Sequence, residues 1–158
     1  MKKKILVDYF SLSNRWSRRL PKIRNISSRT LKLMNSFYNK NCIYYINLIL
    51  SDKNKLKTLN KLYKKNSSDT DVLTFVNKLS HKNVGKIFYC DIFFSIDKIN
   101  KYIDKNNVNF YEHFNHLLIH SLLHINGYKH NSNKEYKAMK KKEILIMQKL
   151  GYSDPYKD

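Results

Sequence analysis

The stretch that most constrains the fold is residues 109–127, NFYEHFNHLLIHSLLHING, which is apolar nearly all round when it is wound into a helix. A helix that is hydrophobic on most of its faces belongs in the centre of a domain, where other elements cover it. Gly127 follows the last turn and supplies the left-handed residue with which many helices end. We therefore expect a domain built around this one helix.

The rest of the chain predicts a small sheet packed on that helix. Runs rich in β-branched and aromatic residues predict strands at 5–10, 42–50, 72–76 and 85–96. Helical spacing of apolar residues predicts helices at 27–39, 53–65, 95–103 and 132–151. The helix starts have serine caps available: Ser27 or Ser28, Ser95, and Ser132 with Glu135 as a capping box. The irregular alternation indicates an α+β or α/β class, and 158 residues suit a single domain spanning 1–158.

The formal net charge of +19 favours a polyanionic partner, either nucleic acid or an anionic membrane surface. A second explanation is available, because Lys, Asn, Ile and Tyr are abundant whereas Ala, Gly and Pro are scarce. The abundant residues have A/T-rich codons, so mutational bias alone could raise the lysine content. Charge by itself therefore does not decide whether the protein binds nucleic acid.

Targeting signals are weak, which favours a cytoplasmic protein. No apolar run approaches the ~20 residues that cross a bilayer, and Asp8 interrupts the apolar segment behind the basic start. Residues 9–51 lack Asp and Glu and resemble a transit peptide in composition, although they also have the pattern of folded structure. Cys42 and Cys90 are far apart and form no CxxC pair, so we expect two buried, reduced thiols.

Three histidines within HSLLHINGYKH (120–130) predict a metal site. His120 and His124 are four residues apart, so they point the same way from a helix and can offer two nitrogens to one ion. A chain reversal at Gly127 can bring His130 to the same point. Three neutral imidazoles around Zn²⁺ leave one coordination position open, which is typical of catalytic rather than structural zinc.

Two alternatives stay open at this stage. His113 and His116 lie on the same helical stripe, so the ligand set could be shifted, or these histidines could simply hydrogen-bond within a core. The H-x3-H-x5-H spacing also equals that of the metzincin proteases. In those enzymes a glutamate follows the first histidine and acts as general base, whereas Ser121 stands there in this chain. Serine cannot take that role at neutral pH, which argues against a peptidase.

The same residues resemble the YbeY endoribonucleases, a family of zinc-dependent rRNA maturation factors. HSLLHINGYKH is similar to the family motif H-G-x-L-H-L-x-G-Y-D-H, and residues 59–75 and 90–95 resemble two further family segments through their T-D-V-L and D-I-x-x-S patterns. In the last helix the matching positions are Met139, Glu143 and Gly151. The resemblance covers roughly residues 55–151, and the first 50 residues agree only in the order of their elements.

The resemblance implies an α+β fold with a small mixed four-stranded sheet around the metal-bearing helix. It implies that His120, His124 and His130 bind one zinc ion, with His120 also among the catalytic residues, and that no organic cofactor is needed. The implied activity is hydrolysis of single-stranded RNA in 3′-end maturation of 16S rRNA and in ribosome quality control. The implied partners are rRNA and the small ribosomal subunit, with no membrane.

Four positions depart from the family pattern. Lys64 replaces the family's catalytic-site arginine; it would stabilise negative charge developing on phosphorus, but as a point charge rather than a two-pronged donor. Lys65 is a neighbouring candidate, and either lysine could instead be a solvated surface charge. Ser121 replaces a glycine and is expected to add bulk beside the metal, Lys129 replaces an aspartate, and Asp69 replaces a proline.

The general base cannot be identified from the residues. Asp71 and Asp91 are the nearest candidates, although a structural cap and a buried hydrogen-bonded carboxylate are the competing interpretations. We therefore hypothesise that zinc binds the scissile phosphate, activates water, or does both. In the same hypothesis the basic surface steers RNA, and tyrosines near the site stack its bases. The rival hypothesis is a ribosome-associated RNA-binding protein whose zinc site has little or no nuclease activity.

Overall fold

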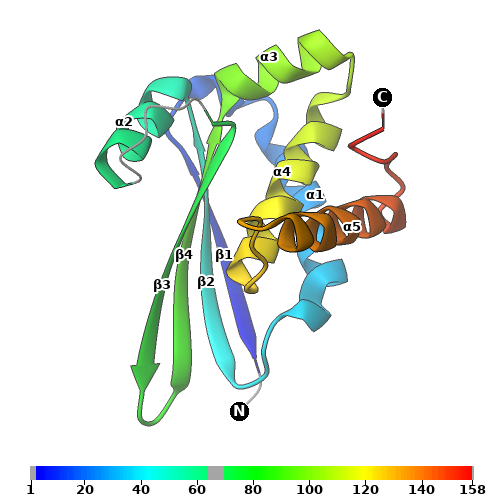
Figure 1. Ribbon diagram of the computed structural model, residues 1–158. Coiled ribbons are helices and arrows are strands. Elements are labelled where there is room, and N and C mark those ends of the chain that lie inside the picture. The colour runs from blue at the N-terminus through cyan, green and yellow to red at the C-terminus, as the bar shows by residue number, and fades with distance from the viewer. Residues whose placement is uncertain (1–2, 64–69, 158) are drawn as a thin grey trace.

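The computed structural model describes residues 3–63 and 70–157 and shows a four-stranded sheet with α1, α4 and α5 on one of its faces (Figure 1). The strands are β1 (Lys4–Ser11), β2 (Cys42–Ser51), β3 (Val72–His81) and β4 (Gly85–Ser95). The α-helices are α1 (Leu20–Leu33), α2 (Lys53–Tyr63), α3 (Ile96–Asn106), α4 (Phe110–Ile125) and α5 (Asn133–Lys149). The class is therefore α+β.

The sheet is mixed and has the strand order β1-β2-β4-β3. β1, β2 and β4 run parallel, and the edge strand β3 pairs antiparallel with β4. Side chains alternate between the two faces of a strand, and in β2 the fully buried positions Tyr44, Ile46 and Leu48 follow this alternation. These residues belong to the main hydrophobic core, which lies between the sheet and the helices.

Helix α4 occupies the centre of the fold, as its all-round hydrophobicity predicted. It contacts α1, α3, α5 and β3, and most of its residues are buried. Phe114 is fully buried, with its ring centroid 4.5 Å from that of Phe94 and 6.2 Å from that of Trp16. The crossover between the parallel strands β1 and β2 contains α1, which packs against α4 on the same face of the sheet.

The end of α4 is set by Gly127, whose φ of +92° confirms the predicted left-handed residue. The amide of Tyr128 donates to the carbonyl of Leu123, and the amide of Gly127 donates to the carbonyl of His124, each at 3.0 Å. This pair of hydrogen bonds is the Schellman motif. It reverses the chain sharply, so that the residues after Gly127 run back beside the last turn of the helix.

Two elements, α1 and β3, differ most from the prediction. α1 begins at Leu20, with Pro21 in its first turn, so the serines expected as its cap lie inside it; Ser27 Oγ donates instead to the Ile23 carbonyl at 2.6 Å. The many basic residues of 15–29 obscured the helical period. β3 continues to His81, five residues beyond the predicted strand, because its exposed outer half still pairs with β4.

Two further expectations concern the thiols and membranes. Cys42 and Cys90 are buried and free, which confirms the prediction for both. Within the described ranges, no helix is both long enough and apolar enough to cross a bilayer.

Candidate metal centre

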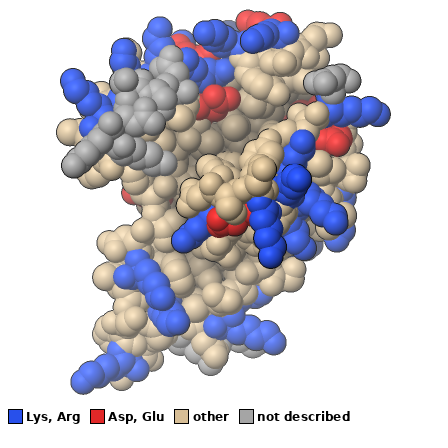
Figure 2. All heavy atoms as spheres, in the orientation of Figure 1, with Lys and Arg blue, Asp and Glu red and all other residues tan. Residues whose placement is uncertain are grey.

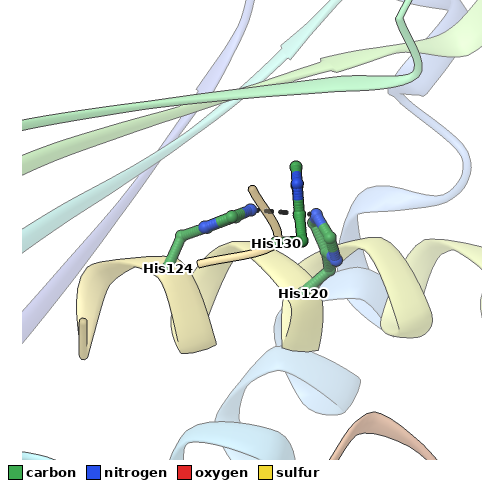
Figure 3. Close-up of side chains that lie close together, drawn as sticks. All are labelled: His120, His124 and His130. Atoms are coloured by element: carbon green, nitrogen blue, oxygen red, sulfur yellow. Dashed lines mark hydrogen bonds between the residues drawn. The ribbon is translucent and has the colours of Figure 1, made fainter. Parts of the chain in front are cut away.

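The three predicted histidines lie together at one end of α4 (Figure 3). His120 and His124 project from successive turns of the helix, and His130 comes from the segment that follows Gly127. One ring nitrogen of each can be chosen so that all three atoms lie within 4.8 Å of one another. Of the residues in 3–63 and 70–157, these form the one group of His, Cys, Asp or Glu side chains close enough to hold an ion.

The chain reversal at Gly127 fixes the tautomer of His124, that is, which ring nitrogen carries the proton. Its Nδ1 lies 2.9 Å from the carbonyl oxygen of Tyr128. A carbonyl oxygen can only accept a hydrogen bond, so Nδ1 carries the proton, and the lone pair of the neutral ring is on Nε2. The turn that returns His130 to the site therefore also aims the Nε2 lone pair of His124 into it.

His120 is fixed in the same way by an acidic residue of α5. Its Nδ1 is hydrogen-bonded to Oε1 of Glu143, and because a carboxylate only accepts, Nε2 again carries the lone pair. The two Nε2 atoms of His120 and His124 lie 3.0 Å apart. Two lone pairs at that distance repel unless a cation lies between them. Zinc–nitrogen bonds of 2.0–2.1 Å in a tetrahedral site separate two nitrogens by about 3.3 Å, so this donor set suits a metal.

Glu143 is the shared acceptor of the hydrogen bonds behind His120. It is fully buried on α5, and its Oε2 accepts from His116 Nε2 at 3.1 Å and from the Tyr156 hydroxyl. Burial by itself would raise the pKa of Glu143. Hydrogen bonds from His116 and His120 outweigh burial and lower the pKa to about 2. Glu143 is therefore a carboxylate at neutral pH. Burial and the adjoining Glu143 carboxylate raise the pKa of the Tyr156 hydroxyl, which stays protonated.

The other histidines of the α4 stripe are engaged elsewhere. His116 donates to Glu143, and His113 Nε2 lies 3.1 Å from Oδ2 of Asp71, with its ring stacked on that of Tyr102. Neither histidine belongs to the group that could hold an ion. Of the alternatives considered from the sequence, hydrogen bonding inside the fold describes this pair.

The two candidate bases occupy different places. Asp71 pairs with His113 rather than capping a helix, and it lines a cavity of about 340 Å³ that also touches His120. Asp91 accepts from Asn47 Nδ2 at 2.9 Å. Its β4 neighbours Cys90 and Ile92 are buried against the helices, so Asp91 points to the opposite face of the sheet, away from the histidines. Its position excludes Asp91 as a base at this site.

A groove of about 510 Å³ runs between the histidines and the edge strand β3. Its lining residues are Thr70, Val72, Leu73, Thr74, Val76, His120, His124, Lys129, His130 and Asn131. Lys129 is exposed and lines this groove, so a cation stands at the position where the resembling family motif has an aspartate. On the face seen in Figure 2, Lys and Arg side chains outnumber Asp and Glu, which suits an anionic substrate. Lys64, Lys65 and Asp69 lie outside the described residues.

Ser121 does not stand beside the metal site, contrary to expectation. It is fully buried and is not among the residues that line the groove. Its hydroxyl has no hydrogen-bond partner within the part of the chain that the structure describes. The extra atoms relative to glycine are therefore accommodated in the core of the domain.

We expect the Ser121→Ala substitution to raise the free energy of unfolding by about 1 kcal/mol, because it removes a buried hydroxyl without a partner and introduces a better helix former. Urea denaturation monitored by circular dichroism would measure this. Ser132→Ala is the matched control: Ser132 caps α5 by accepting from the Glu135 amide at 3.2 Å, so its loss should lower stability by about 1 kcal/mol. A destabilised Ser121→Ala variant would contradict the unpartnered hydroxyl.

Two contributors to the site were not assigned a role from the sequence. Glu143 lies on the same face of α5 as the buried residues Met139 and Met147, and a carboxylate on an apolar face signals a specific partner. That signal could have identified it. Tyr156 lies beyond the last helix in an irregular segment, and no sequence pattern connects it to His120.

Comparisons with known proteins point to one family. The sequence profile described as Endoribonuclease YbeY matches residues 11–151. A curated relative named Endoribonuclease YbeY from Buchnera aphidicola subsp. Cinara cedri is 39% identical over 133 residues, covering 80% of this chain and 81% of the relative. The relative of the same name from Bartonella quintana is 27% identical over 154 residues, covering 96% and 97%.

A solved structure supports the fold separately. The solution structure of a protein from Thermotoga maritima superposes with a TM-score of 0.52 and covers 98% of this chain and 99% of that one. Its sequence identity is 22%, so the likeness concerns the arrangement of helices and strands alone.

Proposed function

Because the chain belongs to the YbeY endoribonuclease family, we propose that it cleaves single-stranded RNA with one zinc ion held by His120, His124 and His130. One observation carries the proposal: hydrogen bonds at both Nδ1 atoms direct the Nε2 lone pairs of His120 and His124 toward the same point, 3.0 Å apart. A pair of rings held this way has little use without a cation. We further propose that residues 1–158 act as one metal-hydrolase domain.

The roles of the surrounding residues follow from their charge and position. When bound, zinc supplies Lewis-acid activation of water and of a phosphoryl oxygen. We propose that Lys64 stabilises negative charge on the phosphorus, as the family's arginine position suggests, and that the exposed Lys129 attracts the RNA backbone to the groove. Asp71 is the remaining candidate for a base, although its bond to His113 favours a structural role.

The groove favours a single strand as the substrate. Its volume of about 510 Å³ falls in the range of sites that hold a ligand of nucleotide size. We propose 16S rRNA near its 3′ end as the substrate, with rRNA and the small ribosomal subunit as partners in the cytoplasm. Ribosome quality control is the second process in which we place the protein.

Removing the metal should abolish the activity. We expect protein stripped with a chelator to leave a single-stranded RNA intact, and stoichiometric zinc to restore cleavage, while a duplex of the same sequence is spared. Gel analysis of end-labelled RNA and metal analysis of the protein would measure both properties. Cleavage that persists after the metal is removed would contradict a zinc-dependent nuclease.

The second candidate, an RNA-binding protein with an inactive zinc site, is supported by Lys129 at the groove and by the replacement of the family's arginine with Lys64. Zinc-loaded protein that binds the single strand without cutting it would establish this second function.

A further inference from the structure

We propose that Tyr156 is a positioning residue of the metal centre, so that the C-terminal segment after α5 takes part in metal binding. The inference rests on the proposed function in that it takes His120 as a metal ligand. Among the described residues, no hydrogen bond or ring contact joins Tyr156 to the three histidines of the cluster. It acts through Glu143, whose two carboxylate oxygens connect the C-terminal segment to His120.

The first step is that the two carboxylate oxygens of Glu143 accept hydrogen bonds from different partners. Oε1 accepts from His120 Nδ1, whereas Oε2 accepts from His116 Nε2 and from the Tyr156 hydroxyl. A carboxylate with a single partner can rotate about its terminal bond. Two donors on Oε2 fix that rotation, and with it the direction in which Oε1 meets His120. Such outer hydrogen bonds orient a metal-binding imidazole and set its tautomer.

The second step is that Tyr156 is itself held in place. The Ser153 hydroxyl donates to Oε1 of Glu112 on α4 at 2.7 Å. The Tyr156 amide donates to Oδ1 of Asp154 at 2.8 Å, which forms an Asx turn around Pro155. The segment is thus anchored to α4 and bent before it presents Tyr156. An ordered donor loses little conformational entropy when it binds Glu143, so its hydroxyl can act as a fixed support.

The third step separates the hydroxyl from the ring. The Tyr156 ring meets the His116 ring edge-on at a centroid distance of 5.3 Å, and Lys140 Nζ lies 4.7 Å from the same centroid. Phenylalanine would keep both ring contacts and lose only the hydrogen bond to Glu143. The Tyr156→Phe variant therefore tests the hydroxyl without removing the packing of the C-terminal segment.

The experiment measures zinc affinity by competition with a chromophoric chelator in the full-length protein. We expect Tyr156→Phe to raise the zinc dissociation constant roughly three- to tenfold and Glu143→Gln to raise it roughly 10- to 100-fold. Tyr152→Phe, in the same segment, is the matched control for the tyrosine and should change it less than about twofold. Glu135→Gln, a half-buried residue in the first turn of the same helix and outside the histidine cluster, is the control for the glutamate.

A second readout does not depend on metal. Nitrogen-15 spectra of the histidine side chains in zinc-free protein should show His120 as the Nδ1-H tautomer in the parent chain and a mixture of tautomers in Glu143→Gln. An Nε2-H tautomer of His120 in the parent chain would overturn the inference. A Tyr156→Phe variant that binds zinc as tightly as the Tyr152→Phe variant would also overturn the inference. If the parent chain itself binds no zinc, the proposed function fails instead, and the tautomer still reports on the positioning by Glu143.

Discussion

Replacing His124 with alanine is expected to weaken zinc binding by more than ~100-fold and to abolish cleavage of single-stranded RNA. Losing an outer hydrogen bond to a metal ligand already costs 10- to 100-fold in affinity, and losing the ligand itself costs more. His124 is also the ring whose Nε2 lies 3.0 Å from that of His120, so the remaining two imidazoles would lack their closest partner. Metal analysis and a cleavage assay on the same preparation would check both expectations.

His81→Ala is the control for this substitution. His81 is exposed at the end of β3, and it is outside the group that could hold an ion. The His81→Ala variant should bind zinc as tightly as the parent chain does. A His124→Ala variant that retains stoichiometric, tight zinc would show that the three histidines are not the ligand set. A variant that loses zinc yet still cuts RNA would separate the nuclease from the metal.

The second large effect concerns stability. We expect Phe114→Ala to lower the free energy of unfolding by about 3–5 kcal/mol, the usual cost of leaving a cavity where a buried phenylalanine packed. Phe114 is fully buried between Trp16 and Phe94 on the helix that carries His120 and His124. Because domains of this kind are stable by only about 5–15 kcal/mol, a large part of the total would be lost. Urea denaturation of zinc-free protein would measure it.

Leu145→Ala provides the comparison, since Leu145 is a large apolar residue that is 44% exposed on α5. Its removal should change the free energy of unfolding by less than about 0.5 kcal/mol. Excess zinc should recover part of the stability of Phe114→Ala, because an ion that binds only the folded state stabilises it by mass action. Equal effects of the two substitutions would contradict the central position of α4.

The cluster of three histidines could be predicted because its determinants are local. His120 and His124 share a helical face by periodicity alone, and Gly127 announces the left-handed turn that returns His130. Along the chain, each of these residues lies within four positions of the next one, from His120 through His124 and Gly127 to His130. A sequence read one segment at a time therefore carries the whole pattern.

The predicted boundaries of α1 and β3 were wrong because the local signals there are weak. α1 buries Ile23 and Ile26, but the arginines and lysines around them weaken the periodic signal. The outer half of β3 is exposed and has little hydrophobic alternation; it is a strand because β4 offers it backbone partners. Pairing across a sheet depends on the neighbouring strand, which no local pattern describes.

The sequence by itself determined that an all-round apolar helix must be central and that three imidazoles converge where this helix ends. Only the tertiary structure decided which ring nitrogen of His120 carries the proton. Glu143 is 23 residues from His120 and Tyr156 is 13 residues beyond Glu143, and packing of α5 across α4 brings them together. A tautomer is set by the atom that faces a nitrogen at about 3 Å, and that atom belongs to another element of the fold.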